Sequence, residues 1–442
     1  MRRGEKPGQG KVYQVREYQP IIGRRPHSGV DPGTICQVEE DFFQELRNLY
    51  LEKAQEGEDG SAFLSLGKDC RLGGEVLKAK NYVGVLEGPS GSLLEILPKI
   101  YHAEESLEQT RKIFLKMLRY LGNYPGKSFR NARLETGETP LLEVFIRMYL
   151  DEVGALLKKG LKSAYRTLEG NLPYYKGKLQ VAGQIRYNLV HKERFYVSYD
   201  EFLLDRPENR LVKATLEYLA PRSRDAGNIR EIWQQLAHFD GVKASVHHEK
   251  EFARVTHDRS ASHYETLLAW SRVFLGKKSF LSTPGVERAS SILYPMEKVF
   301  EDYVGKNLRS LLWGTSWSAE LQHKGPYLFD NYFQMKPDIL LKEGGKPKVI
   351  LDTKWKILTK EQRNYNISQQ DMYQMYAYGK KFNVPEIVLL YPLARGFSNE
   401  MKISYDSGDG VRVRVFFVDL SRDIREVLVE LLTMLEIQKG GS

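Results

Sequence analysis

Two acidic residues and a lysine near the end of the chain lie at the ends of short apolar runs. Asp338 precedes the run 339–341, and Asp352 follows the run 349–351. A Glu-Gly-Gly-Lys turn separates the runs, so we expect them to pair as a hairpin that places each carboxylate at a strand end. Lys354 is two residues beyond Asp352 and therefore projects from the same face of an extended strand. The sequence thus predicts two carboxylates and one ammonium group close together.

These residue types suit metal-assisted hydrolysis. Hard divalent cations prefer carboxylate oxygens, and a site with two acids leaves coordination positions for water and a phosphate oxygen. A nearby lysine can orient the attacking water or neutralise the charge that develops in the transition state. The alternative interpretation is that Asp352 and Lys354 form a solvated ion pair on one strand face, which would contribute little.

Downstream of the hairpin, residues 368–382 have the spacing of a helix. Gln374 and Tyr378 lie four residues apart, so their side chains share one face of that helix. Both residues could assist a neighbouring site. Ordinary helix packing is the alternative explanation for the pair.

Upstream, we expect a helix to open within residues 293–304, with Pro295 at a permitted position in its first turn. This helix offers Glu297 and Glu301, again four residues apart, as a further acid. An exposed helix face would explain Glu301 equally well.

The composition is that of an ordinary globular protein, with 41% hydrophobic and 28% charged residues among 442. This length predicts two or three domains. The sequence contains neither a membrane-length apolar run nor a charged-then-apolar leader. Cys36 and Cys70 are the only cysteines, which favours a reducing compartment. We therefore expect a cytoplasmic location.

The net charge of +9 is spread unevenly. Residues 281–442 carry 22 Lys+Arg and 20 Asp+Glu, which leaves +7 in the first 280 residues. The carboxy-terminal part is therefore not a strongly basic clamp, and the front part would hold nucleic acid or meet an acidic partner. No phosphate-binding loop of the Gly-x-x-x-x-Gly-Lys-Ser/Thr type occurs, so we expect the chain itself to bind no nucleotide.

Shifts in composition divide the chain into four predicted parts. Residues 1–34 are rich in Gly, Pro, Arg and Lys and predict a flexible start without a core. Residues 35–105 combine a helix with short strands in a small β-rich module. Residues 106–280 mix helices and strands, and aromatic and basic residues alternate between 174 and 219, as in a nucleic-acid groove or an ordinary strand pair. Residues 281–442 form the part with the acidic site.

The order of these motifs resembles that of the PD-(D/E)xK nuclease superfamily. Pro337-Asp338 matches the first catalytic pair, and Asp352-Thr353-Lys354 matches the second. Gln374 and Tyr378 match the helical motif of one large branch. Glu301, or alternatively Glu297, matches the helix acid.

At a larger scale, the chain resembles the McrC family, the nuclease subunits of McrBC modification-dependent restriction systems. The resemblance spans most of residues 80–440. It rests on Leu97-Pro98-Lys99-Ile100, on Lys176-Gly177-Lys178, on residues 205–213 and on the nuclease motifs. It implies an α+β multidomain fold, in which an amino-terminal β-rich and helical partner-binding region precedes an α/β PD-(D/E)xK endonuclease domain with a mixed central sheet.

The resemblance also implies an activity and its requirements. The partner would be an McrB-like AAA+ GTPase ring, and the substrate double-stranded DNA carrying modified cytosine, cut in antiviral defence. Mg²⁺, with Mn²⁺ as a substitute, would be held by the three acids, and the other three residues would assist catalysis. The acids are Asp338, Asp352 and Glu301, and the assisting residues are Lys354, Gln374 and Tyr378.

Two other functions remain open at this point. A stand-alone repair or recombination nuclease would cut DNA without any GTPase. A non-catalytic adaptor would keep the nuclease fold only to bind DNA beside an AAA+ motor. The complete set of Asp338, Asp352 and Lys354 argues against the adaptor, because a degenerate site usually loses one of the three.

Overall fold

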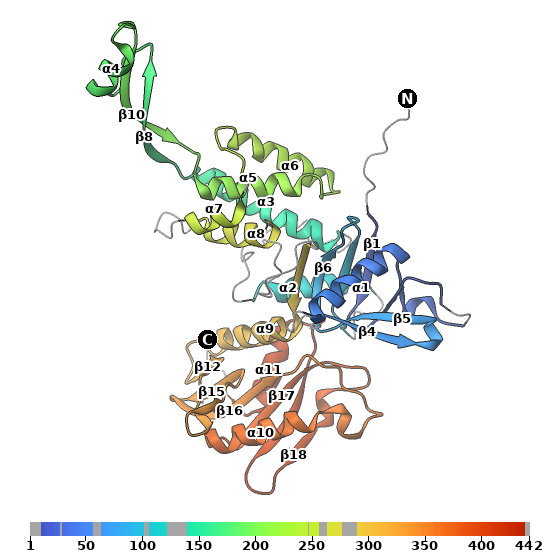
Figure 1. Ribbon diagram of the computed structural model, residues 1–442. Coiled ribbons are helices and arrows are strands. Elements are labelled where there is room, and N and C mark those ends of the chain that lie inside the picture. The colour runs from blue at the N-terminus through green and yellow to red at the C-terminus, as the bar shows by residue number, and fades with distance from the viewer. Residues whose placement is uncertain are drawn as a thin grey trace. The chain divides into compact units, whose positions relative to one another are not determined.

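The computed structural model describes residues 10–26, 29–55, 63–100, 106–121, 139–245, 247–255, 263–275 and 290–437. The chain divides into two compact units, one formed by Met1–Leu141 with Phe280–Ser442 and the other by Leu142–Ser279. Both units combine helices with strands, and the described strands form several separate sheets (Figure 1), which confirms the expected α+β multidomain class. Among the described residues, no helix is both long and apolar enough to cross a membrane.

The amino-terminal part of the first unit, called the front part below, contains a four-stranded sheet in the order β1-β7-β6-β11. Strand β1 (Val12–Arg16) runs parallel to β7 (Leu93–Leu97), and β6 (Tyr82–Glu87) is antiparallel to both β7 and β11 (Ser290–Pro295). Strand β11 continues directly into helix α9 (Met296–Leu311). The front sheet is therefore joined without a linker to the helix that carries Glu297 and Glu301.

A second front sheet has the order β3-β2-β5-β4. Its strands are β3 (Cys36–Gln37), β2 (Pro20–Ile22), β5 (Gly74–Ala79) and β4 (Leu64–Asp69). Helix α1 (Glu40–Gln55) contributes Phe42, Phe43 and Leu46 to the core between the two front sheets. Helix α2 (Leu107–Leu118) is fixed by a buried ion pair, Arg111 Nε to Glu95 Oε1 at 2.8 Å.

The expectation of a coreless flexible start over residues 1–34 is wrong for its described residues. Val15, Ile21 and Ile22 are each at most 1% exposed, because β1 and β2 are strands of the two front sheets. Strand β1 pairs with β7 and β2 pairs with β5, in both cases more than fifty residues away, so local composition gave no sign of these pairings. Residues 1–9 and 27–28 lie outside the described part.

The predicted start of the last domain also differs from the structure. Leu293, Tyr294 and Pro295 belong to β11, and the expected helix begins only at Met296. Strand β11 pairs with β6 along its whole length, and this long-range pairing overrides the local helical pattern. The predicted boundary at 280/281 lies outside the described residues, so the structure does not describe the join itself.

The carboxy-terminal part of the first unit, called the rear part below, is built on a six-stranded mixed sheet in the order β12-β15-β16-β17-β19-β18. Only β16-β17 and β17-β19 are parallel pairs. The strands are β12 (Trp317–Leu321), β15 (Ile339–Glu343), β16 (Lys346–Thr353), β17 (Glu386–Pro392), β18 (Ser404–Asp406) and β19 (Arg412–Val418). A short separate hairpin, β13 (Tyr327–Phe329) and β14 (Tyr332–Gln334), lies between β12 and β15 in the chain.

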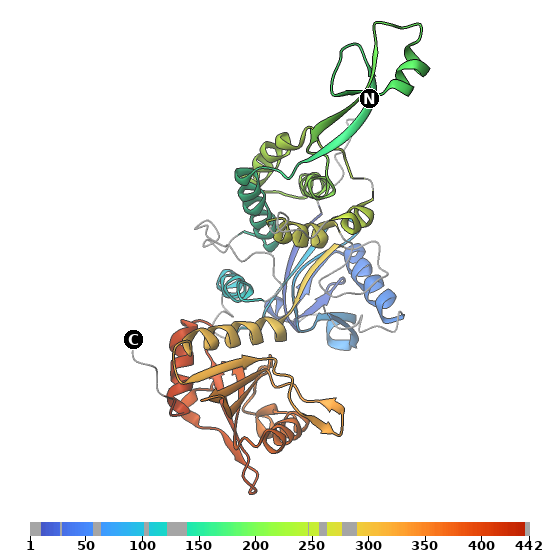
Figure 2. The same ribbon diagram turned by 90° about the vertical axis from the view of Figure 1, so that its left-hand side faces the viewer.

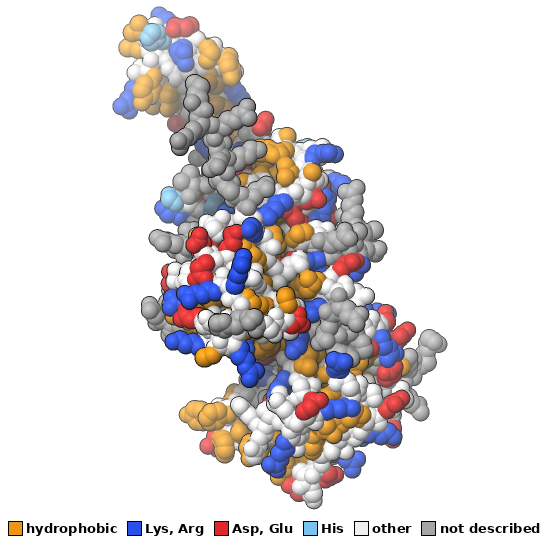
Figure 3. Space-filling view, turned by 90° about the vertical axis from the view of Figure 1, so that its right-hand side faces the viewer, with side chains coloured by type: hydrophobic (Ala, Val, Ile, Leu, Met, Phe, Trp, Pro, Cys, Tyr) orange, Lys and Arg blue, Asp and Glu red, His pale blue; other side chains and the backbone are white. Residues whose placement is uncertain are grey.

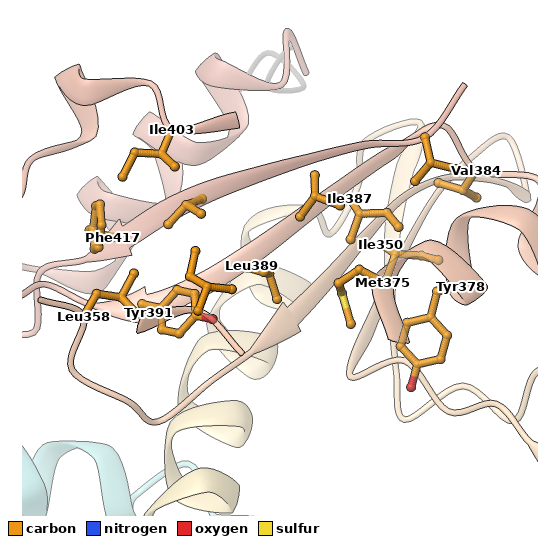
Figure 4. Close-up of a cluster of buried hydrophobic side chains, with 14 of the residues drawn as sticks. Ile350, Leu358, Met375, Tyr378, Val384, Ile387, Leu389, Tyr391, Ile403 and Phe417 are labelled. Carbon is orange, nitrogen blue, oxygen red and sulfur yellow. The ribbon is translucent and has the colours of Figure 1, made fainter. Parts of the chain in front are cut away.

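Helices cover both faces of this sheet (Figure 2). Helix α10 (Gln369–Phe382) packs Met375 and Tyr378 on the face that carries Ile350 and other buried apolar side chains (Figure 4). Helices α9 and α11 (Ile424–Met434) pack on the other face. Successive side chains of a strand point to opposite faces of the sheet, so the covered strands carry apolar side chains on both faces. The polar groups lie at the strand ends.

The second unit combines a group of helices with one long hairpin. The helices are α3 (Leu141–Lys159), α5 (Pro207–Leu219), α6 (Ala226–Leu236), α7 (His248–Arg254) and α8 (Glu265–Leu275). Strands β8 (Ala164–Leu172) and β10 (Phe195–Leu203) pair over nine residues, and short β9 (Lys178–Leu179) and helix α4 (Val181–Asn188) lie between them in sequence. We call residues 164–203 the arm, because they extend away from the helices of this unit (Figure 1).

Candidate active site

The predicted hairpin forms and brings the two aspartates to the same end of the sheet. Strand β15 begins directly after Asp338, and its register pairs Ile339 with Leu351, so Asp338 lies beside Asp352 and Thr353. The Asp338 Oδ2 accepts hydrogen bonds from the Thr353 backbone nitrogen at 2.8 Å and from its hydroxyl at 2.7 Å. Thr353 thereby fixes the orientation of the first carboxylate, a role that the sequence analysis did not assign to it.

Asp352 and Lys354 form the expected same-face pair, with Lys354 Nζ 2.8 Å from Asp352 Oδ2. Asp352 is only 2% exposed, whereas the Lys354 side chain is 23% exposed, so the ion pair is partly buried and not fully solvated. Burial, reinforced by the neighbouring Asp338 charge, raises the pKa of Asp352 to about 7, while Lys354 opposes that rise. Two neighbouring carboxylates that are shielded from water repel each other, and a bound cation would relieve this repulsion.

Helix α10 supplies a chain of hydrogen bonds to Lys354. The Lys354 ammonium donates to Gln374 Oε1 at 3.2 Å, and Gln374 Nε2 donates to the Tyr378 hydroxyl at 2.9 Å. Tyr378 in turn donates to the carbonyl oxygen of Lys336 at 3.1 Å. Tyr378 is also buried in the hydrophobic core, so this residue both packs in the core and supports the site through its hydroxyl.

Asp371 is a site residue that the sequence analysis missed. Its Oδ1 is 3.6 Å from Lys354 Nζ, and it lies in the first turn of α10 behind the N-cap Ser368. Asp371 is three residues before Gln374, and that spacing on one helix face could have indicated it.

The two candidate helix acids have different surroundings. Glu301 Oε1 accepts hydrogen bonds from Lys298 at 2.8 Å and from Gln322 at 2.6 Å. Burial, with a further contribution from Asp338, raises the pKa of Glu301, so this acid shares the electrostatic environment of the aspartates. Glu297 instead accepts a hydrogen bond from Asn81 of the front part at 2.9 Å. This difference favours Glu301 as the third acid.

One cavity of about 710 Å³ is lined by most of the candidate site residues, whereas Tyr378 is not among its lining residues. The candidates that line it are Asp338, Asp352, Thr353, Lys354, Asp371, Gln374, Glu297 and Glu301. The front part of the same unit forms one of its walls with Glu17, Tyr18, Asn81 and Lys99. Glu17 is buried and accepts hydrogen bonds from Trp355 Nε1, at 3.1 and 3.0 Å, and from the Lys99 backbone nitrogen at 3.0 Å. Burial raises the pKa of Glu17 to about 8 despite these donors. Since Glu17 lies in the supposedly flexible start, no sequence signal pointed to it.

The donor set fits a hard divalent cation by its chemistry. Six carboxylates line the cavity, among them Asp338, Asp352 and Glu301. Repulsion from Asp338 contributes to the raised pKa of both Asp352 and Glu301. In the conformation described, no three His, Cys, Asp or Glu side chains among the described residues are close enough to enclose a metal ion. The acids would therefore have to draw together around an ion.

Comparisons with known proteins identify a family and a shared fold. The family model for "McrBC 5-methylcytosine restriction system component" matches residues 77–392. No curated protein matches the chain. A chain from the refined half-complex of a tetradecameric assembly of Thermococcus gammatolerans McrB AAA+ hexamers with bound McrC superposes with a TM-score of 0.73. It is 16% identical, and the match covers 95% of this chain and 100% of that one.

A second solved structure, the cryo-EM structure of the Thermococcus gammatolerans McrBC complex, contains a chain that matches with a TM-score of 0.49. The two chains are 17% identical, over 66% of this chain and 86% of that one. At such identities the half-complex match shows a shared fold and no more, whereas the family match rests on the sequence itself.

Proposed function

The chain belongs to the McrBC family, whose model matches residues 77–392 of its 442, and we propose that it is the nuclease subunit of a GTP-driven restriction complex. Its substrate would be double-stranded DNA carrying modified cytosine, and its reaction the hydrolysis of a phosphodiester. The observation that carries this proposal is the convergence of Asp338, Asp352 and Lys354 in one cavity. The order of these residues in the PD-(D/E)xK motif and the mixed sheet beneath them support it.

Asp338 and Asp352 would hold Mg²⁺, or Mn²⁺ in its place, with Glu301 assisting directly or through a water molecule. The bound ion would polarise the phosphodiester and lower the pKa of a coordinated water. Thr353 holds the Asp338 carboxylate in place for this task. The chain itself would need no other cofactor.

Lys354 would position the attacking water and balance the negative charge that builds up on the phosphate. Its ammonium is held between Asp352 and Gln374, so little rotamer freedom remains to be lost when substrate binds. Tyr378 fixes Gln374 and ties it to the backbone of Lys336, two residues before Asp338. The residues of α10 therefore support the geometry of the lysine.

The arm is the surface that best suits a protein partner. Large apolar side chains are rarely exposed in such density on a monomer. In the arm, seven of them are at least half exposed: Tyr174, Tyr175, Val181, Ile185, Tyr187, Leu189 and Val190. We assign this surface to an McrB-like AAA+ GTPase ring, which would recognise the modified DNA. The free cysteines Cys36 and Cys70 are compatible with a cytoplasmic place for such a complex.

The decisive experiment is reconstitution with an McrB-like AAA+ GTPase from the same organism. We expect the two proteins to copurify, GTP hydrolysis to rise when this chain is added, and DNA with 5-methylcytosine to be cut only with Mg²⁺ and GTP. Asp352→Ala should abolish cleavage but retain copurification. Asp406→Asn, an exposed acid at the opposite end of the sheet, is the matched control and should cut normally.

Each competing function predicts a different result from the same reconstitution. Cleavage by this chain alone, unaffected by any GTPase, would establish a stand-alone nuclease. DNA binding without cleavage under every metal condition would establish an adaptor. Near-normal cleavage by the Asp352→Ala complex would overturn the site assignment.

A further inference from the structure

The short hairpin β13–β14, residues 327–334, carries an unusual concentration of exposed aromatic side chains. We call it the aromatic hairpin. Phe329, Tyr332 and Phe333 are 63%, 71% and 74% exposed, and Tyr327 is 38% exposed. Figure 3 shows hydrophobic side chains gathered on a projection from the rear part of the chain. Exposure of this kind normally marks a surface that binds something.

The base of the aromatic hairpin is firmly attached to the fold. The Gly325 nitrogen donates to the Met335 carbonyl at 2.9 Å, and the Met335 nitrogen donates to the Pro326 carbonyl at 3.0 Å. Met335 is buried in the core with Tyr378, and a Cβ on Gly325 would lie 2.1 Å from the Phe382 ring. The hairpin therefore presents its side chains from a fixed base.

Two residues of the aromatic hairpin have backbone conformations that cost energy. Phe333 has a φ of 59° and Asp330 a φ of 39°, in the left-handed region that a bulky side chain such as Phe rarely adopts. The Phe333 ring contacts Phe329 edge-on, with centroids 6.3 Å apart. A strained backbone conformation at an exposed aromatic residue indicates that this side chain has a functional role.

The aromatic hairpin is also close to the candidate active site along the chain. Gln334 precedes Asp338 by four residues, a span of at most about 13 Å. Lys324 and Lys336 flank the hairpin, both are exposed, and neither forms an ion pair with any described residue. Aromatic faces between unpaired cations are the combination that binds nucleic acid through bases and phosphates together.

We propose that the aromatic hairpin inserts its side chains between base pairs of the DNA beside the scissile phosphodiester. The proposal rests on the proposed nuclease function, and it assigns the base-contacting element of that site. Apolar and aromatic wedges unstack a base step and bend the duplex, so more of it contacts the protein. Lys324 and Lys336 would hold the phosphates on either side, which keeps the bent strand near Asp338.

The test uses the full chain, alone and assembled with its GTPase, on short duplexes with 2-aminopurine at successive positions and without divalent cations. This base fluoresces more strongly when it is unstacked. The native chain should bind and raise the fluorescence at one or two positions. The double variant Phe329→Ala, Tyr332→Ala should bind at least about 5-fold more weakly, because each lost stacking contact weakens binding, and should lose the fluorescence rise. Trp313→Ala, which removes an 87% exposed aromatic outside the hairpin, should behave as the native chain.

The outcomes separate this proposal from the nuclease assignment. Asp352→Ala should keep the fluorescence rise while losing cleavage. A native complex that unstacks DNA but never cuts it would leave the aromatic hairpin as proposed and overturn the nuclease function. No fluorescence rise with the native chain in either form, or unchanged affinity in the double variant, would overturn the hairpin proposal. An altered sedimentation coefficient with unchanged DNA affinity would instead assign the surface to a second copy of the chain.

Discussion

Thr353 donates two hydrogen bonds to a single carboxylate oxygen of Asp338, one from its backbone nitrogen at 2.8 Å and one from its hydroxyl at 2.7 Å. The contact links the end of β16 to the residue that directly precedes β15, so the two strands set the distance between the aspartates. The Asp-x-Lys motif allows any residue at its middle position. In this chain that residue is Thr353, and it orients the Asp338 carboxylate.

Thr353→Val should slow cleavage by about tenfold, since one hydrogen bond to a charged group contributes roughly 1.5 kcal/mol. Valine keeps the branched shape that suits the strand, so the fold should be retained. Single-turnover cleavage over a range of Mg²⁺ concentrations measures the effect. Thr353→Ser retains the hydroxyl and should stay near the native rate; equal losses in Ser and Val would mean that the hydroxyl does not act through Asp338.

The elements of this site that depend on short-range patterns could be predicted from the sequence. The hairpin around the Gly344-Gly345 turn and helix α10 with Gln374 and Tyr378 depend on short-range patterns, and both form where predicted. The contribution of the front part could not be read. Glu17 reaches Trp355 across 338 residues, and no local periodicity reports a contact of that separation. Strand β11 was missed for the same reason, since the strand with which it pairs in the described part of the chain is the distant β6.

Lys354→Ala should reduce the rate of the chemical step by roughly 10²- to 10³-fold, the usual cost of removing one group that stabilises the transition state. Mg²⁺ affinity should change much less, because an ammonium group is not a metal ligand. Isothermal calorimetry of Mg²⁺ binding beside single-turnover cleavage separates the two effects. Equal losses in both measurements would contradict the role assigned to Lys354.

Glu17→Gln should make the protein more stable at alkaline pH. Burial raises the pKa of Glu17 from its usual 4.5 to about 8, so the folded state binds this proton more tightly than the unfolded state does. Its contribution to stability is therefore complete below pH 4.5, declines as the pH rises towards 8, and changes no further above that. The glutamine side chain has no proton to lose, and the gain at pH 8 should reach a few kcal/mol.

Thermal unfolding of the native chain and of Glu17→Gln across this pH range measures the difference. The midpoints should be closest at acidic pH and diverge as the pH rises. Other titrating groups cancel in the comparison because both proteins contain them. A constant offset across the range would mean that Glu17 is ionised in the folded state throughout.

The arm offers the sharpest test of the division between partner binding and cleavage. Leu172 and Phe195 are register partners at the far end of the β8–β10 ladder, so residues 173–194 can be replaced by an Asn-Gly turn that closes the hairpin. Because this removes most of the exposed apolar surface, the shortened chain should no longer bind the GTPase or raise its turnover. Mg²⁺ affinity should be unchanged, since the acids belong to the other unit.

Point variants refine the same prediction. Leu189→Asp with Val190→Asp places charges on the most exposed apolar residues of the arm and should reproduce the loss of GTPase stimulation. Trp313→Asp makes a comparable change on the rear part of the first unit and should leave stimulation intact. Turnover of the GTPase, measured with increasing amounts of each chain, gives both the affinity and the maximal rate. If the shortened chain folds and still stimulates fully, the partner contacts another surface and the assignment of the arm is wrong.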